Sequence, residues 1–223
     1  MKRITTLLIV GCLALLLAAS ICSAQMYTAI DLGTLPGDLY SQGLAVNIFD
    51  QVVGDSLDPL GQSRAFLWTK KEGVQSLGTL PSGGESHARG INNFGQVVGF
   101  TYNGQAHAFL WTEGEGMQDL GTLPGYLSRQ ASGINDFGQV VGSCFSYNVN
   151  VPPHAFLWTK AEGMQDLGTL PGGTQSVATA INDFSQVIPP YHLWVTVHSC
   201  GHKAEACRIW VIVSAALSLT GEA

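Results

Sequence analysis

Three phrases between Gly90 and Gly125 carry the main structural signal of this chain: Gly90-Ile91-Asn92-Asn93-Phe94-Gly95-Gln96-Val97-Val98-Gly99, His107-Ala108-Phe109-Leu110-Trp111-Thr112 and Asp119-Leu120-Gly121-Thr122-Leu123-Pro124-Gly125. All three recur in the same order elsewhere in the chain. The glycine of the third phrase falls at 33, 78, 121 and 168, so the period is 45, 43 and 47 residues. A fixed order at a near-constant period identifies an internal repeat.

Each repeat is predicted to form four short antiparallel strands. In the central copy these are residues 88–92, 96–102, 107–112 and 117–123. Asn93-Phe94-Gly95 and Asn103-Gly104 are turn sequences that tolerate left-handed backbone. Pro124-Gly125 ends the last strand, because proline cannot donate to a ladder. No stretch beyond the N-terminus has a convincing helical period, so the predicted class is all-β.

Four-stranded repeats of about 45 residues are typical of β-propeller blades. Two arrangements are compatible with the ends of the array. In a closed four-blade ring, Tyr27–Leu32 would supply the fourth strand of a last blade built from residues 177–197. In an open partial propeller, cut from a longer array, a raw edge would remain that invites aggregation or a partner. A β-sandwich or prism built from hairpins is the alternative outside the propeller class.

The N-terminus has the features of a secretory signal peptide. Lys2 and Arg3 precede a 13-residue apolar core, Leu7–Ala19, and Cys22-Ser23-Ala24 places a small residue before the expected cleavage site. The core is shorter than the roughly 20 residues of a membrane-spanning helix. We therefore divide the chain into a signal peptide (1–24), a repeat region (25–187) and a divergent tail (188–223). The mature protein is expected to be secreted or at the cell surface, with the periplasm as an alternative, and to have no stable membrane span.

Composition excludes some partners. The 223 residues carry a formal charge of −6, and only 12% are charged. An acidic chain without a basic stripe is poorly suited to bind a phosphate backbone, so no nucleic-acid partner is expected.

The phrases resemble the HAF-repeat family of bacterial exported proteins, which is named after a His-Ala-Phe sequence. That sequence occurs here at His107–Phe109 and His154–Phe156, and the resemblance covers roughly residues 28–187. It implies an extracellular repeat protein of undefined activity and brings no catalytic residues with it. The first copy departs from the pattern at Arg64, and the pattern stops after Val187.

The aromatic residues of the second phrase are predicted to form the repeat core. They are Phe66, Phe109, Phe156, Trp68, Trp111 and Trp158. A carbohydrate-stacking platform is the functional alternative for the tryptophans. His107 and His154 are expected to bond to their turns rather than ring a metal, because Arg64 replaces the histidine in the first copy.

No metal or cofactor site is predicted. The Asn/Asp turns that begin at Asn92, Asn135 and Asn182 offer too few oxygens for calcium, which takes six to eight. In the tail, His198, Cys200, His202 and Cys207 match no common zinc spacing. Cys200 and Cys207 form a candidate disulfide, because export permits one.

No catalytic residues are predicted, since the unrepeated acids Asp38, Asp55, Asp58 and Glu85 have no spacing that pairs them. We expect a non-catalytic protein with a binding or surface-structural role and an unidentified extracellular partner, either a glycan or a protein. Recognition is expected at three loops where the copies differ most: 55–62, 126–129 and 143–153. The alternatives are a carbohydrate-active enzyme on the same scaffold and a truncated, non-functional piece of a longer array.

Overall fold

A computed structural model describes residues 29–148, 150–188, 194–196 and 210–212. The chain divides into two compact units, Met1–Asp31 and Leu32–Ala223, and all the strands lie in the second. Every regular element in the described residues is a strand, as the sequence predicts. None of these residues belongs to a helix that is long and apolar enough to cross a membrane.

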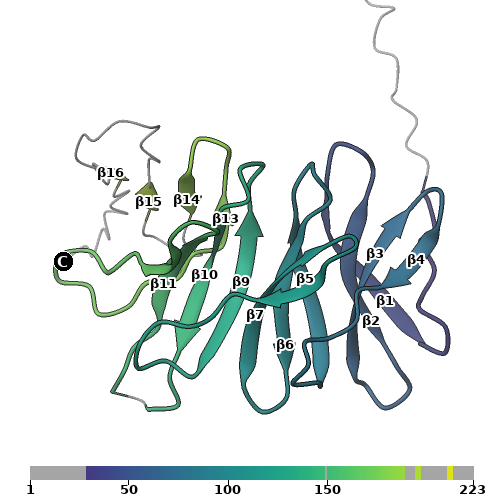
Figure 1. Ribbon diagram of the computed structural model, residues 1–223, viewed down its shortest axis with the longest axis horizontal. Helices are drawn as coiled ribbons and strands as arrows, with labels where there is room; N and C mark the ends of the chain where they lie inside the picture. Colours follow the sequence, from purple (N-terminus) through teal and green to yellow (C-terminus); the bar gives the residue numbers. More distant parts are fainter. Residues whose placement is uncertain (1–28, 149, 189–193, 197–209, 213–223) are drawn as a thin grey trace, which may run out of the picture. The chain divides into compact units, whose positions relative to one another are not determined.

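The strands form four antiparallel sheets of four strands each (Figure 1). The first sheet contains β1 (Tyr40–Val46), β2 (Val52–Leu57), β3 (Ser63–Thr69) and β4 (Gly73–Ser76). The second contains β5 (Glu85–Ile91), β6 (Val97–Tyr102), β7 (Ala106–Thr112) and β8 (Gly116–Asp119). The third contains β9 (Ser128–Ile134), β10 (Val140–Phe145), β11 (His154–Thr159) and β12 (Gly163–Asp166). The fourth contains β13 (Ala180–Ile181), β14 (Gln186–Ile188), β15 (Trp194–Thr196) and β16 (Trp210–Ile212).

In each of the first three sheets, a β-bulge interrupts the pairing of the first two strands. In the second sheet the register shifts between Ala88 and Gly90, opposite Gly99. A Cβ atom on Gly99 would lie 1.9 Å from the carbonyl oxygen of His87. The close approach of the two strands explains why every Val-Val phrase is followed by glycine at this position.

Successive sheets pack face to face and bury the apolar residues of the repeats. Strand β5 contacts β2 and β3, and β9 contacts β6 and β7 in the same way. The cluster between the first two sheets includes Val53 and Leu67 from the first and Ala88 and Phe109 from the second. The second and third sheets therefore each meet the preceding sheet on one side and the next sheet on the other.

The aromatic residues of the second phrase differ in burial. Phe66, Phe109 and Phe156 are fully buried, and Trp158 is only 6% exposed. Trp68 and Trp111 are half-buried instead. The phenylalanines point into the packed layer between sheets. Trp68 and Trp111 stand one residue before the end of their strands and are only partly covered, whereas Trp158 belongs to the packed core.

The described residues contain no closed ring or barrel. No extended contact joins the first and fourth sheets, and the fourth strand of the last sheet is β16, from the tail, instead of Tyr27–Leu32. The first copy of the third phrase packs on the first sheet, because Leu35 is buried there and its amide donates to Ser56 Oγ at 3.1 Å. Tyr27 itself lies outside the described residues.

Candidate functional site: the asparagine turns and the phenylalanine row

The turn between the first two strands of each sheet is built around one asparagine side chain. In the second sheet, Asn92 Oδ1 accepts hydrogen bonds from the amides of Phe94 and Gln96, at 3.1 and 3.0 Å. Its Nδ2 donates to Gln96 Oε1 at 2.8 Å. Asn47, Asn135 and Asn182 cap their own turns in the same way. We call these four segments the asparagine turns.

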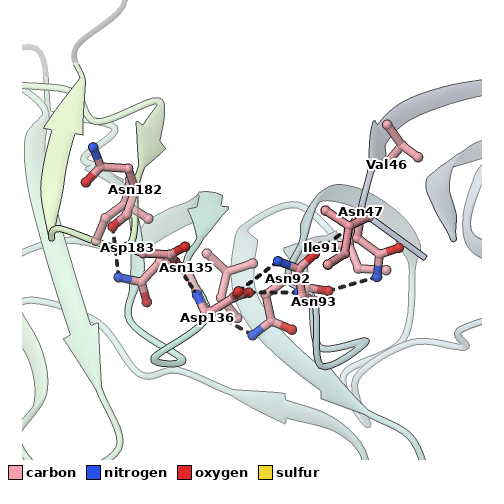
Figure 2. Close-up of a pocket in the computed structure, with 12 residues that line it drawn as sticks. Val46, Asn47, Ile91, Asn92, Asn93, Asn135, Asp136, Asn182 and Asp183 are labelled. Atoms are coloured by element: carbon pink, nitrogen blue, oxygen red, sulfur yellow. Dashed lines mark hydrogen bonds between the residues drawn. The ribbon is translucent and has the colours of Figure 1, made fainter. Parts of the chain in front are cut away.

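The asparagine turns are also bonded to one another (Figure 2). The Nδ2 atoms of Asn47, Asn92 and Asn135 each donate to the backbone carbonyl of the next turn's asparagine, at 3.0, 3.1 and 3.1 Å. A second rung runs from the amide of Asn93 to Asp136 Oδ1 at 2.8 Å, with its counterparts at Ile48 and Asp136. The turns thus form a continuous polar ladder across four sheets.

A pocket of about 400 Å³ lies along this ladder, lined by asparagines, two aspartates and isoleucines. Most of the side-chain oxygens that a cation would need already accept N–H bonds within the turns. Among the described residues, no group of three or more His, Cys, Asp or Glu side chains is placed to hold a metal ion. The asparagines make the turn hydrogen bonds that the sequence analysis favoured over calcium binding.

Each asparagine turn presents one phenylalanine to solvent. Phe49, Phe94, Phe137 and Phe184 are 64, 74, 74 and 77% exposed. We call them the phenylalanine row. Exposure of one large apolar side chain needs no explanation, but the same exposure in four repeats on rigid turns marks a surface suited to binding. The sequence analysis quoted Phe94 within the first repeated phrase and gave it no role.

A second pocket, of about 440 Å³, lies where the first and second sheets meet the phenylalanine row. Phe49, Phe94 and Trp111 supply its aromatic lining, and Thr69, Lys70 and Glu113 are among its polar lining residues. The half-burial of Trp111 follows from this position. We call it the aromatic pocket.

The opposite end of the sheets carries charged clusters. Asp55 is 2% exposed, and its carboxylate accepts from the Ala88 amide at 3.1 Å and from Arg89 at 2.9 Å. His87 Nδ1 lies 3.1 Å from the same carboxylate, and Glu85 lies 3.5 Å from His87 Nε2. Burial alone would raise the pKa of Asp55, but the bonds from His87 and Arg89 outweigh it and lower that pKa.

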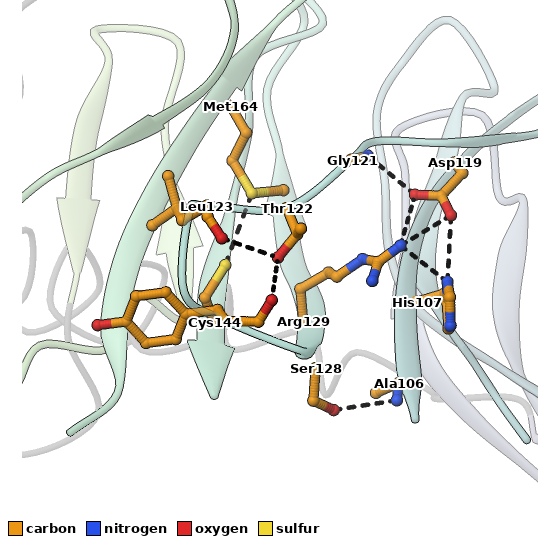
Figure 3. Close-up of polar contacts among 11 residues, drawn as sticks. Ala106, His107, Asp119, Gly121, Thr122, Leu123, Ser128, Arg129, Cys144 and Met164 are labelled. Carbon is orange, nitrogen blue, oxygen red and sulfur yellow. Dashed lines mark hydrogen bonds and ion pairs between the residues drawn. The ribbon is translucent and has the colours of Figure 1, made fainter. Parts of the chain in front are cut away.

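A second cluster joins the second and third sheets (Figure 3). Arg129, which is 7% exposed, donates to both carboxylate oxygens of Asp119 at 3.1 and 2.9 Å. Its guanidinium is also 2.8 Å from His107 Nδ1, which lies 3.2 Å from Asp119. His107 Nδ1 cannot accept from Arg129 and donate to Asp119 at once, so the two contacts compete. Burial opposes ionisation of Asp119, yet the Gly121 amide, His107 and Arg129 lower its pKa.

The remaining repeats have different pairs of side chains at this end of the sheets. His154 Nδ1 lies 2.8 Å from Asp166, and Arg64, which stands where the other copies have histidine, pairs with Asp38. The histidines of the second phrase therefore each lie against an aspartate at this end of the sheets and do not converge on a common centre. Sequence reasoning missed these clusters, since their members are 10 to 34 residues apart.

Several residues in the loops expected to recognise a ligand are held by hydrogen bonds or are buried. Tyr126 donates to the carbonyl of Pro152 at 3.0 Å, Tyr147 donates to Gly104, and Arg129 is buried. Cys144 is fully buried with its Sγ 3.6 Å from Met164 Sδ, and burial raises the pKa of its thiol. Cys200, Cys207 and the tail histidines lie outside the described residues.

Comparison with known protein families gives no match for this chain. A search of curated proteins likewise finds none that is significantly similar.

Proposed function

We propose that this chain is an exported, non-catalytic binding protein that holds an extended polysaccharide along its phenylalanine row. The observation that carries the proposal is the recurrence of one phenylalanine, 64–77% exposed, at the same point of four hydrogen-bonded turns. Burying an aromatic ring against a ligand is favourable, and here the turns are already fixed, so little order is lost on binding.

The neighbours of the row favour a sugar polymer over an apolar ligand. Side chains with amides and hydroxyls lie beside the rings, among them Gln51, Thr69 and Asn93 in the aromatic pocket. The C–H face of a pyranose stacks on an aromatic ring, and its hydroxyls exchange hydrogen bonds with such groups. A polymer of identical units also matches a surface that repeats the same ring in each sheet.

The aromatic pocket is the proposed strongest subsite. Phe49, Phe94 and Trp111 come together there from two sheets. The other two rings of the row, Phe137 and Phe184, are each exposed on a separate turn. Pockets that bind ligands combine apolar walls with a few polar groups that fix orientation.

Export and the repeat type belong to the same proposal. The N-terminal signal-like segment and the likeness to the HAF-repeat family support a secreted or cell-surface protein. We infer that the four sheets are successive blades of an open, propeller-type array, since each is a four-stranded antiparallel meander whose first strand adjoins that of the next.

The test is affinity electrophoresis of the purified chain through gels that contain cellulose derivatives, xylan, soluble chitin or alginate, with a polysaccharide-free gel as reference. We expect retardation by at least one polymer. Phe94→Ala should weaken it by about tenfold, the loss of one stacking contact of about 1.4 kcal/mol.

Leu39→Ala is the matched control, since Leu39 is an apolar residue 75% exposed whose amide donates to the Leu57 carbonyl, at the end of β2 away from the asparagine turns. It should leave retardation unchanged. No retardation by any polymer, or equal retardation of wild type and Phe94→Ala, would overturn the proposal.

A further inference from the structure

Each phenylalanine of the row has a carboxylate nearby. In three asparagine turns it belongs to an aspartate next to the phenylalanine in the sequence: Asp50 beside Phe49, Asp136 beside Phe137, and Asp183 beside Phe184. In the remaining turn Phe94 lies between Asn93 and Gly95, and the carboxylate is that of Glu113, which lines the aromatic pocket together with Phe94. We call Asp50, Glu113, Asp136 and Asp183 the row carboxylates.

Glu113 is the acidic exception at its position in the repeat. It follows Trp111 and Thr112, whereas Lys70 and Lys160 follow the same Trp-Thr pair in the first and third sheets. The second sheet therefore has an acid at this position and lacks one in its asparagine turn. As a result, all four rings of the row have one carboxylate each.

The row carboxylates have no cationic partner in the described residues. None of them forms an ion pair with a lysine, arginine or histidine in that part of the chain. Asp136 accepts hydrogen bonds from the amide and the side chain of Asn93, at 2.8 and 2.7 Å, but these neutral donors leave its charge in place. The acids at the opposite end of the sheets are paired instead: Asp38 with Arg64, Asp55 with Arg89, and Asp119 with Arg129. The charge of the row carboxylates is therefore available to a ligand.

The aromatic rings also favour a positively charged ligand. The face of a phenyl or indole ring carries partial negative charge and attracts a cation within about 6 Å of its centre. Three such rings line the aromatic pocket, those of Phe49, Phe94 and Trp111. Within the described residues, the one cation that lies over an aromatic ring is Arg89, over Phe100 at the other end of the sheets. No described cation of the chain therefore covers the rings of the pocket.

Two lysines line the aromatic pocket and oppose this charge. Lys70 and Lys71 belong to its first-sheet wall, and Lys71 Nζ lies 3.5 Å from the carboxylate of Glu72. Among the lining residues, Lys70 is thus the one unpaired base, and it faces the single unpaired acid Glu113. The whole chain carries a formal charge of −6, which attracts a cationic polymer and repels an acidic one.

We propose that the polymer held along the phenylalanine row is cationic, a chain of amino sugars whose protonated amino groups lie against the rings and the row carboxylates. This inference rests on the proposed function and names the class of its ligand. An amino sugar supplies both contacts, because the C–H groups of its ring stack on an aromatic face and its ammonium group pairs with a carboxylate. A neutral sugar would leave the row carboxylates unpaired, and an acidic sugar would place like charges beside them.

The test is affinity electrophoresis of the purified chain through gels that contain glycol chitosan, glycol chitin or alginate, each compared with a polymer-free gel. The pH is mildly acidic, so that the amino groups of glycol chitosan are protonated. Glycol chitin is the N-acetylated form of glycol chitosan, so the two polymers share a backbone and differ in charge. We expect the strongest retardation by glycol chitosan and the weakest by alginate. Added salt should weaken retardation by glycol chitosan more than retardation by glycol chitin, because salt screens charge pairs at a surface.

Variants of single charged residues locate the charge that the polymer meets. Glu113→Gln should weaken retardation by glycol chitosan about threefold, as expected for one exposed charge pair, and should leave retardation by glycol chitin unchanged. Lys70→Gln removes the opposing charge and should strengthen retardation by glycol chitosan. Asp58→Asn is the matched control, because Asp58 follows the end of β2 remote from the asparagine turn and, like Glu113, forms no ion pair in the described residues. Its Oδ1 accepts from the amides of Leu60 and Gln62, and asparagine keeps that oxygen, so this variant should leave retardation unchanged.

Equal retardation by glycol chitosan and glycol chitin, or stronger retardation by alginate, would overturn this inference and leave the proposed function in place. Equal weakening by Glu113→Gln and Asp58→Asn would also overturn it, because that pattern reports the net charge of the chain and not the row. No retardation by any polymer would overturn the proposed function itself. Thermal melts identical to wild type establish that the variants are folded.

Discussion

The two ends of the sheets carry different kinds of polar contact. At the asparagine turns, every repeat uses one asparagine to cap its own turn and to bond to its neighbour, with distances that vary by only about 0.1 Å from junction to junction. At the opposite end, the repeats use Arg64–Asp38, Asp55–His87–Arg89, Arg129–Asp119–His107 and His154–Asp166.

The contrast between the two ends shows which contacts are common to all repeats. The asparagine ladder requires the backbone carbonyl of the next turn, which only an identical turn at the same position provides. A contact between charged or polar side chains requires only two suitable groups within reach, so the partners vary: the Asp55 and Asp119 clusters join two sheets, whereas the pair of His154 and Asp166 lies within the third sheet. The contacts that are the same in every repeat are therefore the side-chain-to-backbone bonds at the asparagine turns. The contacts that vary are the pairs of side chains at the opposite end of the sheets.

The third sheet illustrates how the variable end compensates for a change. Ser86 and Ser176 accept from the amides of Ala65 and Ala155 in the preceding sheets, at 2.9 Å in both cases. Arg129 occupies the equivalent position, and Ser128 one residue earlier accepts from Ala106 at 3.0 Å instead (Figure 3). The arginine is thereby free to join the cluster with Asp119.

The largest effect is expected at the asparagine ladder. Asn92→Ala removes two caps and one link between sheets from a residue that is 3% exposed, and should destabilise the chain by about 2–4 kcal/mol. Asn182→Ala, at an exposed residue that donates to no further asparagine turn within the part of the chain that the structure describes, should cost about 1 kcal/mol or less. Urea denaturation of both variants measures the difference, and equal losses would mean that the links contribute nothing.

At the variable end we expect a smaller effect that depends on pH. Asp55→Asn keeps the shape and loses the charged pairing with Arg89 and His87, at a cost of about 1–3 kcal/mol at neutral pH. The pKa of Asp55 is lowered by folding, so its stabilisation is complete above the ordinary pKa of an aspartate and is lost as the pH falls through the folded value.

Stability measured by denaturation from pH 7 down to about 3, across the ordinary aspartate pKa, should therefore decline less steeply for Asp55→Asn than for wild type. Parallel profiles would show that Asp55 is not held ionised by these partners. Asn92→Ala is a suitable reference, because it removes no charge and should keep the wild-type slope.

A modest gain is expected from one backbone change. Asp50 has a φ of 60° at the turn position where the second and third repeats have Gly95 and Gly138. Asp50→Gly should stabilise the chain by about 0.5–1 kcal/mol, since glycine adopts this conformation without strain. The reverse change, Gly95→Ala, should destabilise by a similar amount, and thermal melting measures both. A loss on Asp50→Gly would show that the aspartate side chain supports its turn.

The smallest effect on stability is expected in the phenylalanine row. Phe137→Ala removes a side chain that is 74% exposed and should change the free energy of unfolding by no more than about 0.5 kcal/mol. A loss comparable to that of Asn92→Ala would mean that the ring is part of the core and would remove the basis of the proposed binding surface.

Much of the fold follows from the repeat alone. The all-β class, the four-stranded unit and its turns could be predicted. The alternation of apolar and polar residues and the glycines and prolines at turns depend only on nearby residues, and they recur in successive repeats. The assignment of Tyr27–Leu32 to the last sheet could not be settled in this way. Its outcome depends on which surface Leu35 buries, and several sheets offer similar surfaces.

The candidate site was likewise predictable only in part. The sequence determined where each asparagine and phenylalanine falls within its turn, because the spacing between them is fixed over a few residues. The three-dimensional structure was needed to show that the phenylalanines point to solvent, that the asparagines bond between sheets, and that Asp55 meets His87 and Arg89. Those outcomes depend on the packing of sheets whose residues lie tens of positions apart, and burial and pairing at that range leave no periodic trace in the sequence.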